Sequence, residues 1–281
     1  MLADFEKNRR FFSSPRAFYV NANCFIPSDA RQIPMRYIIK QILGDTYMRR
    51  ELVLPKLKIE LSFPQRLCLM VLGGREPSPE WLSSLSFQDE VWAVDRGLDS
   101  CFRADITPGR LIGDGDSAAP QLWKIAEDLA IPISKFHKDK DFTDFQLALD
   151  IYSEINVDRD GAVFITGCFG GRFDHLWSTI VTFISGEGAY IPLCAADERE
   201  GMLFGRGNSD VSLVFSEIPE AISIIPFSTK CSGVTIGGVR WPLSNADLKY
   251  SSPYSISNRL ENSHSIDFSI EEGLAGLYWK W

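Results

Sequence analysis

Residues 162–175 read AVFITGCFGGRFDH, in which an apolar run leads into a glycine-rich loop and a helical pattern follows. The apolar run, Ala162–Thr166, is typical of a strand inside a sheet. We expect a helix to begin near Asp174 and to end near Gly186, because apolar residues recur there at the spacing of one helix face. The stretch therefore predicts a strand, a loop and a helix in the order that α/β proteins repeat.

Further apolar runs precede this unit, and each ends in glycine or polar residues. The expected strands are Leu67–Leu72, Val91–Val94, Arg110–Ile112, Ile131–Phe136 and Ala162–Thr166. Helices fit between them: Pro120 opens one, and Thr143 with Gln146 forms a capping box that opens another. This alternation predicts an α/β fold, with a parallel sheet flanked by helices, of Rossmann-like type. The carboxyl ends of parallel strands share one edge, so the polar clusters should converge there.

The pattern changes after about residue 200, where short β-rich segments are separated by glycine, proline, serine and asparagine turns. The expected strands are Val211–Phe215, Ala221–Pro226, Val234–Trp241, Tyr254–Arg259 and Ser265–Ile270. Such segments indicate an antiparallel, all-β sandwich domain. We therefore divide the chain into an N-terminal extension (residues 1–60), an α/β domain (61–200) and a β-sandwich domain (201–281).

Residues 1–60 carry no motif that is associated with chemistry. They contain a helix-like segment, Pro34–Leu43, and the basic run Met48-Arg49-Arg50. Three interpretations remain open: a partner-binding extension, a strand and helix that support the main domain, and translation from an upstream start codon. The sequence does not choose among them.

Charge is distributed unevenly along the chain. Residues 1–60 hold 11 Lys and Arg against 6 Asp and Glu, whereas residues 61–281 hold 18 against 31. This acidic body argues against nucleic acid as a partner, because phosphate backbones need a basic face. We find no export signal and no apolar run of the roughly 18 to 20 residues that a membrane helix requires. Six cysteines without a C-x-x-C pair indicate buried thiols in a reducing cytoplasm.

The segment Gly113-Asp114-Gly115-Asp116-Ser117 carries the strongest local signal. In an extended segment, side chains two positions apart point the same way, so Asp114 and Asp116 present two carboxylates to one hard cation. A tight Asp-Gly turn, with Ser117 capping the next helix, explains the same residues equally well. The motif alone leaves both interpretations open.

A second acidic cluster lies in Lys138-Asp139-Lys140-Asp141-Phe142-Thr143-Asp144. Asp141 and Asp144 fall at the start of a helix, where free N–H groups and the positive end of the helix dipole suit phosphate, and the lysines neutralise charge. Carboxylates at a helix start are also ordinary caps, which is the simpler interpretation of this cluster by itself.

The glycine-rich loop after Thr166 supplies a third cluster. Its N–H groups can face a phosphate, Arg172 offers a two-pronged fork, and Asp174 can hold a metal, a ribose or a base. The loop lacks the Gly-Lys-Ser/Thr ending of a Walker loop and the dinucleotide fingerprint. Asp95 and the run Gly73-Gly74-Arg75 end two further strands. One such cluster is readily explained as a turn, but five on one edge are not.

Taken in order, these motifs resemble the thiamine pyrophosphokinase family. The matching residues are an Asp at the second strand end, Gly-Asp-x-Asp-Ser at 113–117, Asp-x-x-x-Thr-Asp-Phe at 139–145, Gly-Gly-Arg-x-Asp-His at 170–175, Gly-x-x-Trp-x-Leu at 238–243 and Ser-Asn at 257–258. The resemblance covers roughly residues 66–281. It implies an α/β catalytic, ATP-binding domain and a β-sandwich that binds thiamine, paired as a homodimer whose active sites lie between subunits.

The resemblance also implies functions for single residues. Mg²⁺ would be held by Asp95, Asp114, Asp116, Asp141 and Asp144. ATP would lie against Gly74, Asp95, Lys138, Thr143, Gly171, Arg172 and Asp174. Thiamine would contact Trp241, Ser257 and Asn258; an aromatic face suits its cationic thiazolium or flat pyrimidine, although core packing explains Trp241 equally well. Catalysis would be carried by Asp116, Asp144 and Arg172.

In the implied reaction, the hydroxyl of thiamine attacks the β-phosphorus of ATP, and AMP leaves. Arg96, Leu98-Asp99 and Lys140 depart from the family pattern. Residues 96–99 leave open a pyrophosphokinase for another alcohol, such as a hydroxymethyl pterin. The unexplained extension leaves open a catalytically silent nucleotide-binding module. We expect a cytoplasmic thiamine pyrophosphokinase that uses ATP and Mg²⁺.

Overall fold

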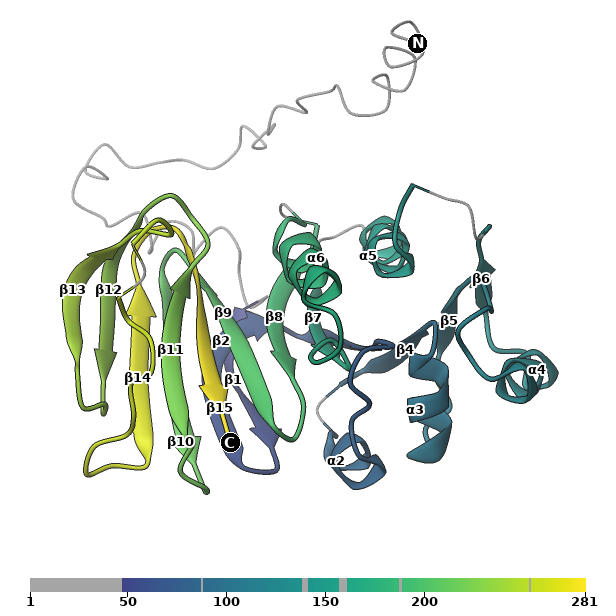
Figure 1. Ribbon diagram of the computed structural model, residues 1–281, viewed down its shortest axis with the longest axis horizontal. Helices are drawn as coiled ribbons and strands as arrows, with labels where there is room; N and C mark the ends of the chain where they lie inside the picture. Colours follow the sequence, from purple (N-terminus) through teal and green to yellow (C-terminus); the bar gives the residue numbers. More distant parts are fainter. Residues whose placement is uncertain (1–46, 87, 138–140, 157–160, 187–188, 253) are drawn as a thin grey trace, which may run out of the picture. The chain divides into compact units, whose positions relative to one another are not determined.

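The computed structural model describes residues 47–281, apart from residues 87, 138–140, 157–160, 187–188 and 253 (Figure 1). The helix expected at Pro34–Leu43 and the side chain of Lys138 lie outside the described residues. Within the described part, the strands form two sheets, one of nine strands and one of six, which we call the large sheet and the small sheet. No helix of this part is long and apolar enough to cross a membrane.

The large sheet joins a parallel half to an antiparallel half. Its strand order is β11-β15-β9-β8-β7-β3-β4-β5-β6. The parallel strands are β3 (Arg66–Val71), β4 (Glu90–Val94), β5 (Arg110–Gly113), β6 (Ile133–Lys135), β7 (Gly161–Thr166) and β8 (Ile191–Ala196). The antiparallel strands are β9 (Glu200–Arg206), β11 (Ala221–Pro226) and β15 (Leu274–Lys280). The parallel strands predicted from the sequence are confirmed, and β8 extends them.

The Rossmann-like description fits this sheet only in part. The strand order reverses at β3, with β4 on one side and β7 on the other, as in doubly wound sheets. The sheet does not end at its last parallel strand, however, because β8 turns back through Asp197 into β9 and antiparallel pairing continues from there. The free edge of β8 offers backbone groups that the strand after a tight turn readily satisfies. The boundary expected at residue 200 therefore falls inside one continuous sheet.

Helices cover both faces of the parallel half. One face carries α2 (Pro79–Ser84), α3 (Gly97–Arg103) and α4 (Pro120–Asp128), and the other carries α5 (Asp144–Ile155) and α6 (Phe173–Ile184) (Figure 1). Alternation along β3 allows this double cover. Leu67, Leu69 and Val71 face the first group of helices, whereas Cys68 and Met70 face the second, and all five are buried.

The small sheet packs on the face of the large sheet that also carries α2, α3 and α4. Its strand order is β1-β2-β10-β14-β12-β13. Its strands are β1 (Tyr47–Leu54), β2 (Leu57–Pro64), β10 (Ser209–Phe215), β12 (Cys231–Gly237), β13 (Leu243–Leu248) and β14 (Ser265–Ile270). Phe215 and Phe268 of the small sheet share a hydrophobic core with Trp279 of the large sheet. The predicted sandwich is present, and the large sheet forms one of its layers.

Residues 47–64 form a hairpin that belongs to the small sheet. β2 pairs antiparallel with β10 in a register that sets Ile59 opposite Leu213. Alternate side chains along Leu57–Phe63 are buried, and those between them are exposed. β2 runs across the boundary expected at residue 60. Of the three interpretations of the extension, this segment fits the supporting strand, although the sandwich is the part that it supports.

We expect Ile59→Ala to lower the free energy of unfolding by about 2–5 kcal/mol, because the lost atoms leave a cavity in the shared core. Val53→Ala in β1 is the matched control: Val53 is 44% exposed and should lose less than about 1 kcal/mol. Urea denaturation followed by circular dichroism gives both values. A hairpin that only rested on the sandwich would show small, equal losses.

Candidate active site

The loops after β3, β4, β5 and β7 lie on one edge of the large sheet. These strands are parallel neighbours in register: Val71 lies opposite Ala93 and Thr166, and Val94 lies opposite Ile112. Neighbouring strands stand about 4.8 Å apart, so the loops follow one another at that spacing. We call this the carboxylate edge. It carries Gly74, Asp95, Asp114, Asp116, Gly171, Arg172 and Asp174.

Asp95 lies against the backbone of the next loop. Its N–H donates to the carbonyl of Ile112 at 2.8 Å, and its backbone adopts a left-handed φ of 51°. Gly113 leaves room for the Asp95 side chain, since a Cβ atom at residue 113 would lie 2.4 Å from Oδ1 of Asp95. A left-handed conformation is uncommon for an Asp and costs energy, so the surrounding fold must hold Asp95 in place.

After β5 the chain turns instead of continuing extended. Oδ1 of Asp114 accepts the N–H of Asp116 at 2.9 Å, which forms an Asx turn. The extended geometry predicted for these two residues is therefore wrong, because a side-chain-to-backbone bond competes with the strand. Asp114 is half-buried and Asp116 is exposed, and both stay next to Asp95 on the edge.

Ser117 is not the cap of the following helix. α4 begins at Pro120, as predicted, and its N-cap is Ala119. Oδ1 of Asp99, in α3, accepts the N–H of Ala119 at 3.2 Å. Asp99 thus holds the start of α4, which gives a structural purpose to a residue that departs from the family pattern.

α5 begins near the same edge and packs against β4 and β5. Its predicted capping box is confirmed: Oγ1 of Thr143 accepts the N–H of Gln146 at 3.2 Å, and Oε1 of Gln146 accepts the N–H of Thr143 at 2.9 Å. Asp144 is half-buried in the first turn, and Asp141 is exposed just before the helix. Both carboxylates thus lie at the positive end of the α5 dipole.

α6 follows the glycine-rich loop directly, as predicted. Gly167, Gly170 and Gly171 have left-handed φ values of 67°, 72° and 68°, which glycine adopts without strain. The loop therefore has a defined backbone that other residue types would resist. Its conformation also depends on neighbours, because glycine has many alternatives available.

Arg172 and Asp174 form an exposed ion pair at the start of α6. Nε of Arg172 donates to Oδ1 of Asp174 at 3.0 Å, and Nη2 donates to Oδ2. These hydrogen bonds lower the pKa of Asp174 and raise the pKa of Arg172. Side chains this exposed gain little from pairing, so a phosphate can replace Asp174 on the Arg172 fork.

Two glycine turns interlock between β3 and β7. The N–H of Gly74 donates to the carbonyl of Gly167 at 2.6 Å, and the N–H of Arg75 donates to the carbonyl of Phe169 at 2.7 Å. A Cβ atom at residue 74 would lie 2.5 Å from the Gly167 oxygen, so this approach requires glycine. The turns lie where the strand order reverses, which is the usual ligand site of an open α/β sheet.

Sequence reasoning missed the side chain of Arg75. Its guanidinium forms ion pairs with Asp197 and Glu200, which lie 122 and 125 positions further along the chain. An Arg after two glycines and two distant acids form no local pattern. Only the fold reveals that they meet.

Trp241, Ser257 and Asn258 come together at the end of the sandwich. Asn258 is buried, and its Oδ1 accepts the N–H of Trp241 at 3.1 Å while its Nδ2 donates to the carbonyl of Trp241 at 2.8 Å. The amide therefore fixes the Trp241 backbone. Ser257 is exposed, with a left-handed φ of 58°. This turn interrupts the strand predicted at Tyr254–Arg259, which is irregular apart from an isolated bridge at Asn258.

The indole of Trp241 is not packed in the core, since Trp241 is 54% exposed. The guanidinium carbons of Arg240 and Arg259 lie 5.2 Å and 6.0 Å from its ring centre. The ring thus already attracts cationic groups of its own chain, as an electron-rich aromatic face does. An incoming flat cation would compete with these two arginines.

The Trp241 group lies far from the carboxylate edge along the large sheet. Asn258 bridges to Ile222 of β11, the outermost strand described on that side, whereas Asp95 follows β4. Six strand spacings separate β11 from β4, a span on the order of 30 Å. Figure 1 shows the two strands toward opposite ends of the large sheet. One subunit therefore does not bring the two groups together along its sheet.

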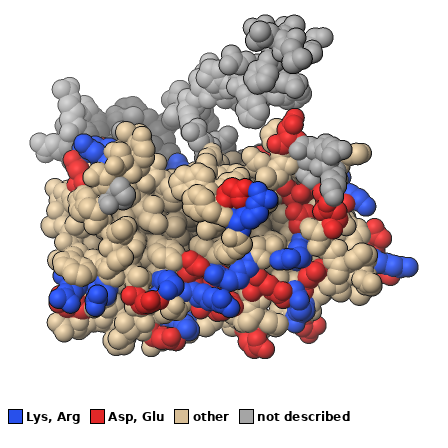
Figure 2. Space-filling model, viewed as in Figure 1, with Lys and Arg blue, Asp and Glu red and all other residues tan. Residues whose placement is uncertain are grey.

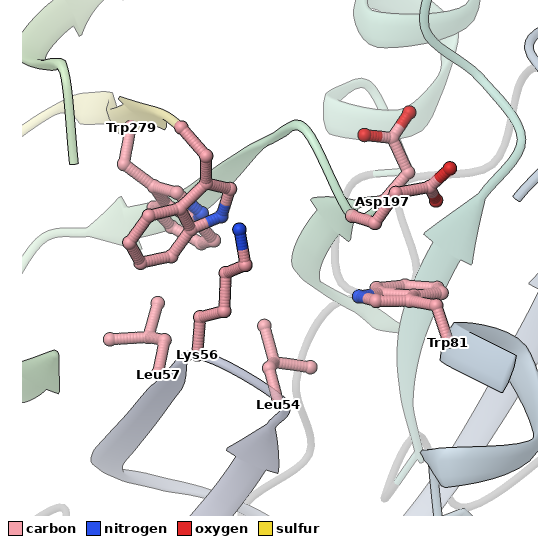
Figure 3. Close-up of a pocket in the computed structure, with 8 residues that line it drawn as sticks. Leu54, Lys56, Leu57, Trp81, Asp197 and Trp279 are labelled. Atoms are coloured by element: carbon pink, nitrogen blue, oxygen red, sulfur yellow. The ribbon is translucent and has the colours of Figure 1, made fainter. Parts of the chain in front are cut away.

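Two cavities of the described part are not lined by any acid of this edge. One, of about 10 Å³, lies among Leu54, Lys56, Trp81 and Trp279 and has room for a water molecule at most (Figure 3). A larger one, of about 210 Å³, lies beside α6. It is lined by Phe169, Phe173, Leu176, Trp177, Ile180, Glu200, Met202, Ile225, Phe227 and Tyr278. This cavity is apolar and is not a metal–phosphate site.

The acids of the edge do not form a ready-made metal cage. Among the residues that the structure describes, no three Asp, Glu, His or Cys side chains are placed to hold one ion together. The carboxylates predicted as one metal set are Asp95, Asp114, Asp116, Asp141 and Asp144; the first three follow two neighbouring strands, and the last two lie at the start of α5. The edge thus offers individual oxygen ligands rather than a closed site.

Comparison with known proteins assigns the family. Residues 83–193 match the catalytic domain of thiamin pyrophosphokinase, and residues 214–275 match its vitamin B1 binding domain. The thiamine pyrophosphokinase of Bacillus subtilis is 30% identical over 207 residues, which cover 73% of this chain and 94% of that protein. The chain belongs to the thiamine pyrophosphokinase family. Thiamin pyrophosphokinase 1 of Caenorhabditis elegans is 29% identical over 179 residues, which cover 58% of this chain and 70% of that protein.

A solved structure agrees with this family assignment. The crystal structure of the B. subtilis thiamine pyrophosphokinase superposes with a TM-score of 0.65 at 27% identity, covering 76% of this chain and 99% of that one. The B. subtilis chain is thus matched almost completely. The unmatched part of the present chain is additional to that fold.

We expect Gly113→Ala to destabilise the protein by about 1–3 kcal/mol, because the new methyl group would displace the Asp95 carboxylate. In an Asp95→Gly background the loss should be smaller, since the clashing oxygen is gone and only the strain of the positive φ of residue 113 remains. Urea denaturation of the double-mutant cycle measures this coupling. Gly109→Ala is the control, because its Cβ would meet Val91 at an ordinary 3.7 Å. Equal losses in both backgrounds would show that Asp95 does not depend on Gly113.

Proposed function

We propose that this chain transfers the pyrophosphate group of ATP to thiamine and releases AMP and thiamine diphosphate. The observation that carries the proposal is the carboxylate edge of a family member: acids and glycine turns from separate strands follow adjacent parallel strands at the reversal of strand order. The triphosphate would lie across this edge. There Gly171, at which an added Cβ would meet nothing within 4 Å, allows close backbone approach, and the start of α5 at Thr143 adds positive potential.

Mg²⁺ fits the donor chemistry of the edge. Magnesium prefers oxygen ligands and is usually bound by one or two carboxylates together with phosphates and water. Asp95, Asp114, Asp116, Asp141 and Asp144 supply such oxygens without forming a closed cage. The ion would enter with ATP and would neutralise charge on the phosphates. Asp114 and Asp116, which share one turn, are the leading ligands.

The side chains of the edge contribute mainly position and charge. Arg172 would exchange Asp174 for a phosphate oxygen and stabilise the charge that develops as the β-phosphorus is attacked. Asp116 and Asp144 would hold the reacting groups in line, and either can accept the hydroxyl proton of thiamine. Asp174, released from Arg172, would lie free to meet the nucleotide.

Thiamine binding would involve the sandwich. Trp241 presents an exposed indole that Asn258 fixes through the backbone, and Ser257 lies exposed beside it. A cationic thiazolium or a flat pyrimidine could stack there, if it displaced Arg240 or Arg259. Asn258 would then act by positioning Trp241, because its amide is already engaged.

We also propose a homodimer in which each active site takes its carboxylate edge from one subunit and its Trp241 group from the other. The span on the order of 30 Å between these groups in one chain supports this arrangement. α6 supplies an apolar surface for pairing: Phe173 and Trp177 are 75% and 53% exposed, and their rings stack with centroids 6.3 Å apart. In Figure 2, residues other than Lys, Arg, Asp and Glu cover most of the upper part of the face shown, and most of the charged residues lie along its lower part and its right side.

The two alternatives rested on features that now have structural explanations. Asp99, one of the residues that pointed to another alcohol, holds the start of α4. The β1–β2 hairpin, part of the extension that pointed to a silent module, supplies two strands to one layer of the sandwich. The vitamin B1 binding match over residues 214–275 favours thiamine over a pterin. A cytoplasmic location remains part of the proposal, and it is supported by the buried, unpaired cysteines among the described residues.

The proposal is tested by incubating the purified protein with ATP, Mg²⁺ and thiamine. We expect AMP and thiamine diphosphate; ADP would indicate ordinary kinase chemistry, and no turnover with thiamine would count against the proposal. Asp116→Asn should lower kcat at least about 100-fold, with little change in unfolding temperature, because an edge carboxylate is lost. Asp105→Asn is the matched control, since Asp105 follows α3 at the opposite end of the strands and its left-handed backbone suits Asn.

The dimer prediction is tested with doubly tagged heterodimers. A heterodimer of an Asp116→Asn subunit with a Trp241→Ala subunit should keep about half of the wild-type activity, because one of its two shared sites is intact. A heterodimer of the double mutant with a wild-type subunit should be nearly inactive, since each site then receives one damaged half. The reverse result would place each active site within one subunit.

A further inference from the structure

The side chain of Arg75 ties the loop after β3 to the turn between β8 and β9. Its Nε donates to Oδ2 of Asp197 at 2.8 Å, and its Nη2 lies 2.7 Å from the same oxygen. Nη2 also pairs with Oε1 of Glu200 at 2.5 Å. The Asp197 side chain has no exposed surface, while those of Arg75 and Glu200 are 21% exposed. This is a largely enclosed fork between one cation and two acids.

The acids at the far end of the fork are themselves anchored. Oδ1 of Asp197 accepts the N–H groups of Arg199 and Glu200 at 2.9 Å and 3.1 Å, which closes the β8–β9 turn. The hydroxyl of Tyr278, in β15, donates to Oε2 of Glu200 at 2.7 Å. Figure 3 shows the Trp81 ring beside Asp197. The antiparallel half of the large sheet thus supplies a rigid anchor for Arg75.

The backbone and stem of Arg75 contact the glycine-rich loop. Its N–H donates to the carbonyl of Phe169 at 2.7 Å, and its guanidinium carbon lies 5.9 Å from the centre of the Phe169 ring. A Cβ atom at Gly170 would lie 2.9 Å from Cβ of Arg75, so the two residues are in close contact. Arg75 therefore lies between the anchor and the loop that precedes α6.

The loop needs such a restraint. Gly167, Gly170 and Gly171 lose more conformational freedom on ordering than any other residue type would, and no side chain of their own holds them. If the loop is already ordered before ATP binds, the entropy cost of ordering it does not weaken the binding of ATP.

We propose that Arg75 is a positioning residue for the glycine-rich loop. Anchored by Asp197 and Glu200, it holds residues 167–171 of this loop in the conformation that receives the triphosphate. The inference rests on the proposed function, because it assigns this loop to ATP. It concerns a residue that would touch the loop and not the reacting atoms. The antiparallel half of the sheet thereby sets the geometry of a site in the parallel half.

The first experiment compares Arg75→Met, Arg75→Lys and the control Arg103→Met in steady-state kinetics. Arg75→Met should raise the KM for ATP roughly 10- to 100-fold and leave the KM for thiamine within about twofold, since misplacement of a positioned group has effects of this size. The KM for ATP of Arg75→Lys should lie between those of the wild type and Arg75→Met, because an ammonium keeps the charge but loses the two-pronged geometry. Arg103 pairs with Glu76 on the surface, so Arg103→Met should resemble the wild type.

The second experiment measures amide hydrogen exchange of residues 167–171 without substrates. Exchange should become faster in Arg75→Met and stay unchanged in Arg103→Met. Glu200→Gln and Tyr278→Phe weaken the anchor while keeping its shape, and they should show the same effects to a smaller degree. Arg75→Met leaves the buried Asp197 carboxylate without its cationic partner, which destabilises the fold. If Arg75→Met does not fold, Glu200→Gln and Tyr278→Phe provide the test.

The outcomes separate this inference from the proposed function. If loop exchange became faster in Arg75→Met but the wild type showed no thiamine turnover, Arg75 would still be shown to order residues 167–171. The assignment of this loop to ATP would then be wrong. Unchanged exchange together with an unchanged KM for ATP, in folded Arg75→Met or in both anchor variants, would overturn the inference. Equal rises in the KM for ATP and for thiamine would also overturn it, because they indicate a general structural effect.

Discussion

The parallel pairing of β3 with β4 on one side and with β7 on the other determines where the polar loops of the site lie. Hydrogen-bonded register brings the ends of these strands to one level, so Asp95 and the two glycine turns become neighbours although they are far apart in the chain. Because the order reverses at β3, the chain leaves β3 toward α2 on one face and leaves β7 toward α6 on the other. The edge between them stays accessible to a ligand.

Electrostatics at this edge favour a metal and a nucleotide together rather than either alone. Acids follow β4 and β5 and also lie at the start of α5, where the helix dipole stabilises negative charge. A bare triphosphate would meet these carboxylates and be repelled, whereas a magnesium ion shared between carboxylate and phosphate oxygens would remove the conflict. The exposed Arg172–Asp174 pair is weak enough to open for the same ligand. These features support one catalytic arrangement on the edge of the sheet.

The sandwich contributes more than a second binding surface. Its large layer is continuous with the parallel sheet, and the core that runs through Phe268 and Trp279 also includes residues of α2, α3 and α4. The β8–β9 turn, which joins the two halves, presents Asp197 and Glu200 to Arg75. The side chain of Arg75 thereby connects the glycine-rich loop to the antiparallel half of the large sheet. Trp241, by contrast, lies near the far end of the large sheet and, in the proposed homodimer, would complete a site of the other subunit.

Local sequence determined the parallel strands, the capping box of Thr143, the helix starts at Pro120 and near Asp174, and the set of acids at strand ends, because apolar periodicity and capping act over a few residues. The tertiary structure decided the rest: the Asx turn at Asp114, the cap that Asp99 gives to α4, the place of the hairpin in one layer of the sandwich, and the Arg75 fork. Those contacts join groups from different elements or select one of several local hydrogen bonds. Their energies depend on distance and burial, which only the folded chain defines.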